Sequence, residues 1–213
     1  MQKHVEVSLQ ASYRTMNEYT DRTKFVWLVF HGYGQLTEFF IRKFQVLDPD
    51  DHFIIAPQGL SKFYLEGFSG RVGATWMTKE DRLTEIDNQQ RYLRAVLESE
   101  VGDLSQGKKL ILFGFSQGVA TMCRFAAYND FSFDRMVLWA GTFPHDLSKE
   151  DTRHWPSDFP MKYFTGRDDP FLKPGMIEAQ EERLIELTGV HPEITQFDGK
   201  HEVRPELLHR VYQ

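Results

Sequence analysis

The sequence of 213 residues contains a single cysteine, Cys123, so no disulfide can form within the chain. Such a chain is typical of a reducing compartment, and we expect the protein to be cytoplasmic. No apolar run approaches the roughly 18 residues that predict a membrane-spanning helix. The first residues, MQKHVEVSLQ, lack the apolar segment of a signal peptide. We therefore expect neither export nor stable membrane insertion.

Long runs of one charge sign are also missing. The net charge is −6, and no block of about five or six like charges occurs. This distribution argues against a nucleic acid or an anionic membrane as partner and favours a small-molecule or lipid-like substrate. The spacing of histidine and acidic residues matches no metal motif such as H-E-x-x-H, so we expect neither a metal nor another cofactor.

The hydrophobic content of 41% over this length is enough for one well-buried core and short for two. We expect a single domain over residues 1–213. Apolar runs typical of buried strands alternate with segments of helical pattern, which predicts an α/β fold with a mostly parallel sheet and helices on both faces. Residues at the carboxyl ends of such strands meet at one edge of the sheet, where ligands bind.

The alternation can be followed along the whole chain. Buried strands are expected at residues 25–30, 53–56, 110–113, 135–140, 161–165 and 193–197, with one or two antiparallel edge strands within 4–17. Helices are expected at 37–47, with Thr37 as the cap, and at 85–98, 119–128, 174–188 and 204–212. The segments 60–78 and 145–160 show no clear periodicity, and we predict that both are irregular.

The segment 108–118, KKLILFGFSQG, predicts a buried strand, a sharp turn that holds Ser116, and the start of a helix. The turn has the G-x-S-x-G pattern, in which a serine lies at a strained strand-to-helix corner and the glycines allow close backbone approach. A helix N-terminus beside the serine favours developing negative charge. A similar run at 67–70, GFSG, has no flanking strand or helix, and we interpret it as a loop. Ser116 is therefore the candidate nucleophile.

Acyl transfer by a serine requires a base and an acid that orients the base. His201 ends a predicted strand and comes after the elbow and an acidic turn, which is the order expected for a serine on such an elbow. An ordinary surface-turn histidine is the alternative. The acid is Asp169 or Asp168 in the turn GRDDP, and the position directly before Pro170 favours Asp169.

The same chemistry needs backbone donors for an oxyanion. The candidates are the N–H of Gln117, directly after the nucleophile, and the N–H of Tyr33 in the turn HGYG. His31 in that turn is interpreted as a hydrogen-bonded structural residue and not as a second base. Trp76 and Phe143 are candidates for an apolar acyl site, with core packing as the alternative for both.

The motifs HGYG, GFSQG, GRDDP and GKH follow one another in the chain, and the Trp76 segment precedes an acidic amphipathic helix. In this order they resemble the phospholipase/carboxylesterase branch of the α/β-hydrolase superfamily, which includes acyl-protein thioesterases and small bacterial carboxylesterases. The resemblance spans residues 25–212 and implies an α/β-hydrolase fold with little or no cap domain. The nucleophile, base, acid and two oxyanion donors that it implies are Ser116, His201, Asp169, Tyr33 and Gln117.

Three features depart from the pattern of that family, one of them the segment 60–78, which looks particular to this chain. Gln35 stands where many relatives have an acidic residue after the first glycine-rich turn. The segment APQG at 56–59 replaces the usual aspartate-containing turn. We expect these differences to lie around the pocket and to affect the choice of substrate, leaving the reaction type unchanged.

The leading hypothesis is a serine hydrolase that cleaves carboxylic esters or thioesters through an acyl-enzyme on Ser116. Because no lid is evident in the sequence, we expect an open pocket for short or medium acyl chains. A peptidase with the same residues, or a non-catalytic binding protein that keeps the fold, are the alternatives. The intact order of serine, acid and histidine argues against the non-catalytic one. The sequence leaves open whether the chain forms a homodimer.

Overall fold

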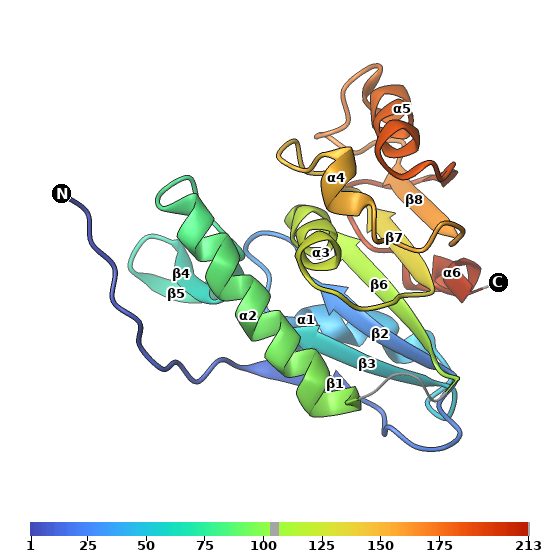
Figure 1. Cartoon of the computed structure of the whole chain (residues 1–213). Helices are drawn as coiled ribbons and strands as arrows, with labels where there is room; N and C mark the ends of the chain where they lie inside the picture. The colour runs from blue at the N-terminus through green and yellow to red at the C-terminus, as the bar shows by residue number, and fades with distance from the viewer. Residues whose placement is uncertain (103–106, 213) are drawn as a thin grey trace.

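The computed structural model describes residues 1–102 and 107–212. A seven-stranded sheet in the order β1-β3-β2-β6-β7-β8-β9 runs through its centre (Figure 1). β1 is antiparallel to β3, and the other neighbouring strands are parallel. The bounds of these strands are β1 Tyr13–Met16, β2 Phe25–Phe30, β3 His52–Pro57, β6 Lys109–Phe115, β7 Arg135–Trp139, β8 Met161–Gly166 and β9 Glu193–Phe197.

Helices cover both faces of the sheet. The longer ones are α2 Arg82–Val101, α3 Gln117–Tyr128 and α5 Met176–Thr188. The shorter ones are α1 Thr37–Phe40, η1 Ile41–Val46, α4 Lys149–Thr152, η2 Pro205–Leu207 and α6 His209–Tyr212. Side chains of α2, α3 and α5 belong to one hydrophobic cluster, and those of α1, η1 and α6 belong to another on the opposite face. The mostly parallel sheet with helices on both faces, predicted from the sequence, is confirmed.

The two faces can be followed along β2. Val26, Leu28 and Phe30 join the cluster that contains α2 and α3, whereas Trp27 and Val29 join the other cluster. Successive side chains of a strand point to opposite faces, so a strand covered on both sides has a continuous apolar sequence. For this reason the apolar runs of the sequence predict the central strands correctly.

The segment 60–78, predicted to be irregular, contains a β-hairpin instead. β4 Ser61–Glu66 pairs with β5 Ser69–Thr75 in a separate antiparallel two-stranded sheet. Apart from the end of β5, most of its residues are exposed or half-buried, so the hairpin lacks the apolar face that predicts a strand. The GFSG run at 67–70 spans the hairpin turn and the start of β5, and no elbow forms there.

Several predicted boundaries need correction. Of residues 4–17, all of which the structure describes, 13–16 form a strand. The helix expected at 37–47 is a short α-helix followed by a 3-10 helix, and Thr37 lies inside it with Leu36 at the cap position. The segment 145–160 contains the short helix α4, and the closing helix is divided into η2 and α6. Residues 103–106, in the predicted connection before the central strand, lie outside the described residues.

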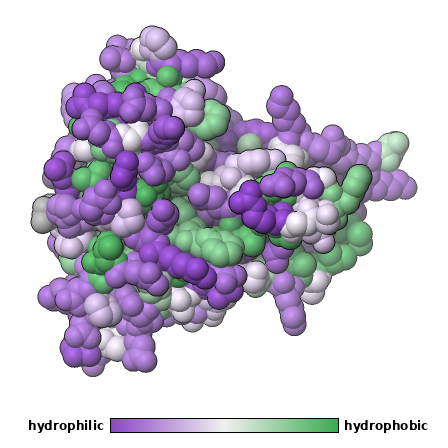
Figure 2. Space-filling model, turned by 180° about the vertical axis from the view of Figure 1, so that it is seen from behind, coloured by the Kyte–Doolittle hydropathy of each residue, from purple (hydrophilic) through white to green (hydrophobic). Residues whose placement is uncertain are grey.

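The outer surface is mainly hydrophilic. Figure 2 shows purple side chains over most of the face seen from behind, with hydrophobic groups distributed among them. In the part of the chain that the structure describes, no helix is long and apolar enough to cross a membrane. Residues 1–10 are exposed, and Nε2 of His4 is 2.7 Å from a carboxylate oxygen of Asp81, the residue before α2.

Candidate active site

Ser116 lies at the corner between β6 and α3. Its backbone angles are φ 53° and ψ −120°, a combination that non-glycine residues seldom adopt. The backbone N–H of Ser116 donates to the carbonyl oxygen of Trp139 at the end of β7, at 2.9 Å. The neighbouring strand therefore holds this strained corner in place.

Close backbone packing explains the glycines on both sides of the serine. A Cβ at Gly118 would lie 2.2 Å from the carbonyl oxygen of Phe30, and a Cβ at Gly114 would lie 2.6 Å from the Cα of Val119. Neither position can accept a side chain without movement of the backbone. The G-x-S-x-G pattern thus corresponds to an elbow packed tightly against β2.

His201 and Asp169 lie beside the serine, in the turns that follow β9 and β8. Nε2 of His201 is 2.9 Å from Oγ of Ser116, and Nδ1 is 2.7 Å from Oδ2 of Asp169. The other carboxylate oxygen of Asp169 accepts a hydrogen bond from the backbone N–H of Phe171 at 2.9 Å. Asp169 is buried, whereas the neighbouring Asp168 is exposed. The structure therefore brings Asp169 to the histidine.

Two phenylalanines enclose the imidazole of His201. The ring centroid of Phe115 is 5.0 Å from that of the imidazole, and the ring of Phe171 stands edge-on at 4.7 Å. Phe115 is buried below the imidazole, and Phe171, 67% exposed, covers it from the solvent side. The imidazole therefore has one buried ring and one exposed ring beside it, while its hydrogen bonds to Asp169 and Ser116 set its orientation.

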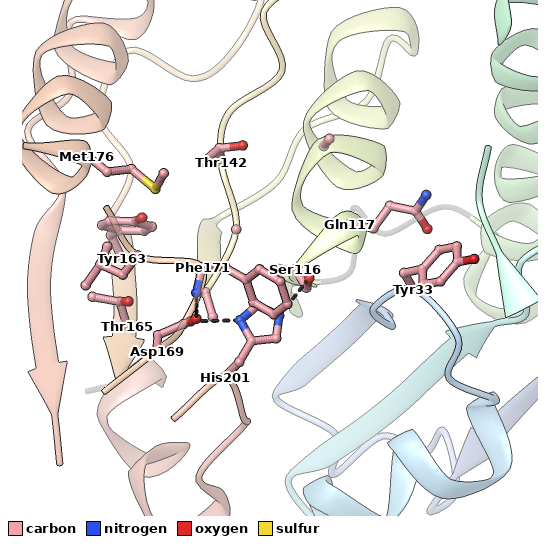
Figure 3. A pocket seen from close by; sticks show the side chains of 14 residues that line it. Tyr33, Ser116, Gln117, Thr142, Tyr163, Thr165, Asp169, Phe171, Met176 and His201 are labelled. Carbon is pink, nitrogen blue, oxygen red and sulfur yellow. Dashed lines mark hydrogen bonds and ion pairs between the residues drawn. The ribbon is translucent and has the colours of Figure 1, made fainter. Parts of the chain in front are cut away.

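A cavity of about 420 Å³ opens at Ser116 and His201. Tyr33, Gln117 and Ala120 line one side of it, and with Ser116 we call them the elbow wall. Figure 3 shows Tyr163, Thr165 and Met176 on the side opposite Tyr33 and Gln117. We call that side, formed by β8 and the segment after it, the β8 wall: Tyr163, Thr165, Asp169, Phe171, Leu172 and Met176.

The elbow wall presents two free backbone donors. Tyr33 and Gln117 both line the cavity, and the backbone N–H of neither has an acceptor among the described residues. The HGYG turn that contains Tyr33 is attached to β5, because the N–H of Gly34 donates to the carbonyl oxygen of Ala74 at 2.8 Å. A fixed turn with a free N–H is the arrangement that an oxyanion site requires.

His31, the first residue of the HGYG turn, anchors the turn in the core. It is fully buried and stacks on Trp76 with ring centroids 4.7 Å apart. The N–H of Gly59 donates to Nε2 of His31 at 3.0 Å, so the proton lies on Nδ1, which donates to the carbonyl oxygen of Gly32 at 2.8 Å. Burial lowers the pKa of His31 to about 4, so the imidazole is neutral near pH 7. These are the contacts of a structural residue and not of a second base.

The side chain of Gln117 attaches the elbow to the end of the hairpin. Its Oε1 accepts a hydrogen bond from the N–H of Trp76 at 3.2 Å. Its Nε2 donates to Oγ1 of Thr75 at 2.9 Å and to the carbonyl oxygen of Met77 at 3.0 Å. The hairpin that the sequence did not predict is therefore tied to the helix that follows the nucleophile.

Trp76 and Phe143, the two aromatic candidates for an acyl site, do not line the cavity. Trp76 is 1% exposed, and its Nε1 donates to the carbonyl oxygen of His31 at 2.7 Å. Phe143 is fully buried in the cluster on the α3 side of the sheet. Both residues therefore pack in the core, which was the alternative to an acyl site. An aromatic side chain in an irregular segment can pack in the core or line a pocket, and the sequence does not distinguish the two.

The side chains that do form the β8 wall were not identified from the sequence. Tyr163 and Thr165 are alternate residues of β8, so both point to the same face. Both hydroxyls lie near the carboxyl end of a predicted strand, where ligands bind. This position in the sequence could have identified the two residues as lining the site. Phe171, Leu172 and Met176 follow in a turn and at the start of a helix, where no periodic pattern marks them.

The single cysteine of the chain, Cys123, does not line the cavity. Cys123 is buried in α3, and burial raises the pKa of its thiol well above the ordinary value. Within residues 1–102 and 107–212, no group of three or more histidine, cysteine or acidic side chains is placed to hold a metal ion.

Comparison with protein families gives a match to the Phospholipase/Carboxylesterase family over residues 13–213. The chain belongs to this family. The matched range contains the elbow, the HGYG turn and both turns that supply Asp169 and His201. A search of curated proteins gives no match.

Several solved structures have the same fold as this chain. Acyl-protein thioesterase 2 from Zea mays is 18% identical, with a TM-score of 0.67 over 95% of this chain and 96% of that chain. A Bacillus cereus carboxylesterase is 14% identical, with a TM-score of 0.64 over 94% and 91%. A phospholipase/carboxylesterase from Dyadobacter fermentans is 16% identical, with a TM-score of 0.62 over 98% and 99%. These similarities confirm the predicted α/β-hydrolase fold.

Two of the departures from the Phospholipase/Carboxylesterase pattern, Gln35 and Gln58 of the APQG segment, lie beside the HGYG turn and do not line the pocket as expected. Oε1 of Gln35 accepts a hydrogen bond from the N–H of Gly32 at 2.9 Å. Oε1 of Gln58 accepts one from the N–H of Thr37 at 2.9 Å, and its Nε2 lies 3.1 Å from Nε2 of His31. Neither glutamine lines the cavity. In this member of the family they support the elbow wall.

Proposed function

We propose that this chain hydrolyses carboxylic esters or thioesters through an acyl-enzyme on Ser116. The observation that carries the proposal is the continuous set of contacts from Oγ of Ser116 through His201 to Asp169, at 2.9 Å and 2.7 Å, on the floor of a cavity. Membership of the Phospholipase/Carboxylesterase family supports this class of reaction.

In the first half of the reaction, Nε2 of His201 takes the proton of Ser116 as Oγ attacks the carbonyl carbon. Asp169 accepts the Nδ1–H of the imidazole, which leaves Nε2 free as the base and stabilises the imidazolium that forms. The N–H groups of Tyr33 and Gln117 receive the negative charge of the carbonyl oxygen. His201 then protonates the departing alcohol or thiol, and the acyl group remains on Ser116.

Water completes the reaction. His201 removes a proton from a water molecule, the hydroxide oxygen attacks the acyl carbon, and the same two N–H groups stabilise the second oxyanion. The carboxylic acid leaves as Oγ of Ser116 regains its proton. Because the oxyanion donors belong to the backbone, any carboxylic ester that reaches Ser116 in the right orientation can use them.

The cavity limits the size of the substrate. Its volume of about 420 Å³ lies in the lower part of the range of about 300 to 1,000 Å³ found for small-molecule sites. Phe171, Leu172 and Met176 supply apolar surface on its β8 wall. We therefore propose substrates with short or medium acyl groups.

The proposal is tested by hydrolysis of a p-nitrophenyl ester series from acetate to palmitate. Ser116→Ala and His201→Ala should each lower kcat by about 10⁴-fold or more, because triad residues act as a unit. Ser69→Ala is the matched control, since this serine also lies in a GFSG run but on the hairpin, and it should keep the wild-type rate. A parallel thiocholine ester series separates ester from thioester preference.

Equal rates for the wild type and Ser116→Ala would contradict the assignment of the nucleophile. Failure of the folded wild type to cleave any ester or thioester of these series, or a peptide substrate tested beside them, would support the non-catalytic alternative.

A further inference from the structure

Hydroxyl groups collect on the β8 wall of the cavity. Tyr163 and Thr165 are 2% and 1% exposed, and both line the cavity. Thr142, in the turn after β7, lines it as well, and Figure 3 shows its side chain above these two. Within residues 1–102 and 107–212 none of the three hydroxyls bonds to another protein group, and none belongs to the fully enclosed polar atoms without a partner, so all three are open to the cavity. Three free hydroxyls therefore face one small space.

The placement of Tyr163 and Thr165 follows from the register of β8. They are alternate residues of a buried strand, so their side chains lie on one face. Phe164 between them points to the other face, where its ring stacks on Trp139 with centroids 4.4 Å apart. The sheet thus holds both side chains on the face that lines the cavity.

The hydroxyls of Tyr163 and Thr165 are open to the cavity and are not among the fully enclosed polar atoms that lack a partner, so water can reach them. An apolar ligand that excludes water from this wall leaves them unpaired, at about 1–3 kcal/mol each, whereas a ligand that carries an oxygen can pair with them. The hydroxyls of Tyr163 and Thr165 can each donate or accept a hydrogen bond.

The charges around the cavity limit which polar group fits. No lysine or arginine is among its described lining residues, and the carboxylate of Asp169 lies at the same wall. An anionic group would therefore enter without a counter-ion. Burial and the nearby Asp169 raise the pKa of Tyr163 to about 12, so the phenol stays protonated and able to donate. A neutral oxygen fits this wall best.

We propose that the hydroxyls of Tyr163 and Thr165 bind a neutral hydroxyl or carbonyl oxygen of the substrate, so that the site selects short esters that carry such a group over unsubstituted ones. The expected substrates are hydroxy- or oxo-substituted esters. The kinetic part of this inference rests on the proposed function, and the binding part does not.

The kinetic test compares matched esters. Methyl β-hydroxybutyrate and methyl acetoacetate are compared with methyl butyrate for the acyl side, and ethylene glycol monobutyrate with propyl butyrate for the alcohol side. The wild type should favour the oxygenated member of at least one comparison by roughly tenfold in kcat/KM, the value of one good hydrogen bond. Preference for the unsubstituted member in every comparison would overturn the inference.

Tyr163→Phe and Thr165→Val each remove one of the two hydroxyls. Each should reduce the ratio of the two kcat/KM values by roughly tenfold, because only the oxygenated substrate loses a partner. Tyr128→Phe is the matched control, since it removes the hydroxyl of an exposed tyrosine at the end of α3 outside the cavity. An unchanged ratio in both wall variants would assign the preference to other groups and contradict the proposal.

Calorimetric titration of Ser116→Ala with the same ester pairs tests binding without turnover. The oxygenated ester should bind roughly tenfold more tightly, and Tyr163→Phe in this background should remove the difference. Equal binding of both esters would overturn the inference even if the wild type hydrolyses them. A binding difference without hydrolysis by the wild type would instead uphold the inference and reject the proposed function.

Discussion

The two walls of the cavity differ in whether their polar groups already have partners. On the elbow wall, the side chain of Gln117 bonds to Thr75 and Met77, and the HGYG turn rests on the buried His31. On the β8 wall, the hydroxyls of Tyr163 and Thr165 are open to the cavity and bond to no other group of the described residues.

This difference separates two tasks. A wall completed by bonds within the protein keeps one geometry, as oxyanion stabilisation requires. A wall with free hydroxyls obtains its hydrogen-bond partners from the bound substrate. We therefore expect that damage to the elbow wall lowers the rate for every ester, and that damage to the β8 wall changes the relative rates of different esters.

Asp169 should give the largest effect and is the exception on the β8 wall, because its carboxylate bonds to His201. Asp169→Asn should lower kcat by about 10⁴-fold for all esters alike, since an amide cannot hold the imidazole in the correct tautomer. Asp168→Asn is the matched control and should keep the wild-type kcat. A comparable loss in Asp168→Asn, or a loss in Asp169→Asn limited to some esters, would break the assignment.

Acid should weaken the elbow wall through His31. The pKa of this imidazole is about 4 in the folded protein and about 6.5 when unfolded. Because the folded pKa is lowered, stability that is present above pH 6.5 is lost as the pH falls toward 4, by up to about 3 kcal/mol. Urea unfolding at a series of pH values measures the loss. Histidine NMR should show His31 neutral near pH 5, and titration at the ordinary pKa would contradict this account.

The ion pair behind the elbow wall should affect stability without affecting selectivity. Arg124 of α3 is buried, and its guanidinium donates to Asp146 at 2.7 Å and 3.0 Å. Burial opposes ionisation of Asp146, but the bonds from Arg124 outweigh it and lower the pKa to about 2. Asp146→Ala should cost about 2 kcal/mol in the free energy of unfolding, because it leaves a buried charge unpaired.

Arg82 provides the control for that variant. It also bonds to Asp146, at 3.0 Å, but is more exposed than Arg124, so Arg82→Ala should cost less than about 1 kcal/mol. Chemical denaturation of both variants checks the order, and the ratio of rates between esters should stay at the wild-type value. Equal costs for the two variants would contradict the importance of the buried charge.

Phe171 should give the smallest effect. Its exposed ring covers His201 and forms the rim of the β8 wall. Phe171→Ala should raise KM by about threefold to tenfold with little change in kcat, because it removes apolar contact worth about 1 kcal/mol and none of the hydrogen bonds of the triad. Phe68→Ala, at the exposed hairpin turn, is the matched control. A large fall in kcat for Phe171→Ala would show that the ring does more than bind substrate.

The five inner strands of the sheet could be predicted from the sequence because they are buried on both faces. FVWLVF at 25–30 is such a strand, and Ser116 and Asp169 follow two others. His201 follows the edge strand β9, which is only partly buried, and was identified by its position after the elbow and the acidic turn. The hairpin at 61–75 could not be predicted, because β4 and β5 pair only with each other in the sheet topology and bury no continuous face.

The contacts that hold the active-site residues in place could not be predicted for a different reason. The bond between Gln117 and Thr75 joins residues 42 positions apart, and no local pattern specifies it. Likewise the sequence offered Trp76 as a pocket residue, but its burial depends on His31 and the turn above it. Contacts between distant segments decide which polar and aromatic side chains reach the cavity.

The most direct test of the central claim is labelling of the folded protein with a fluorophosphonate, followed by intact mass and peptide mapping. We predict one adduct per chain, located on Ser116 and absent in Ser116→Ala, with much slower labelling in Asp169→Asn. A folded wild type that stays unlabelled, or an adduct that persists in Ser116→Ala, would contradict the account.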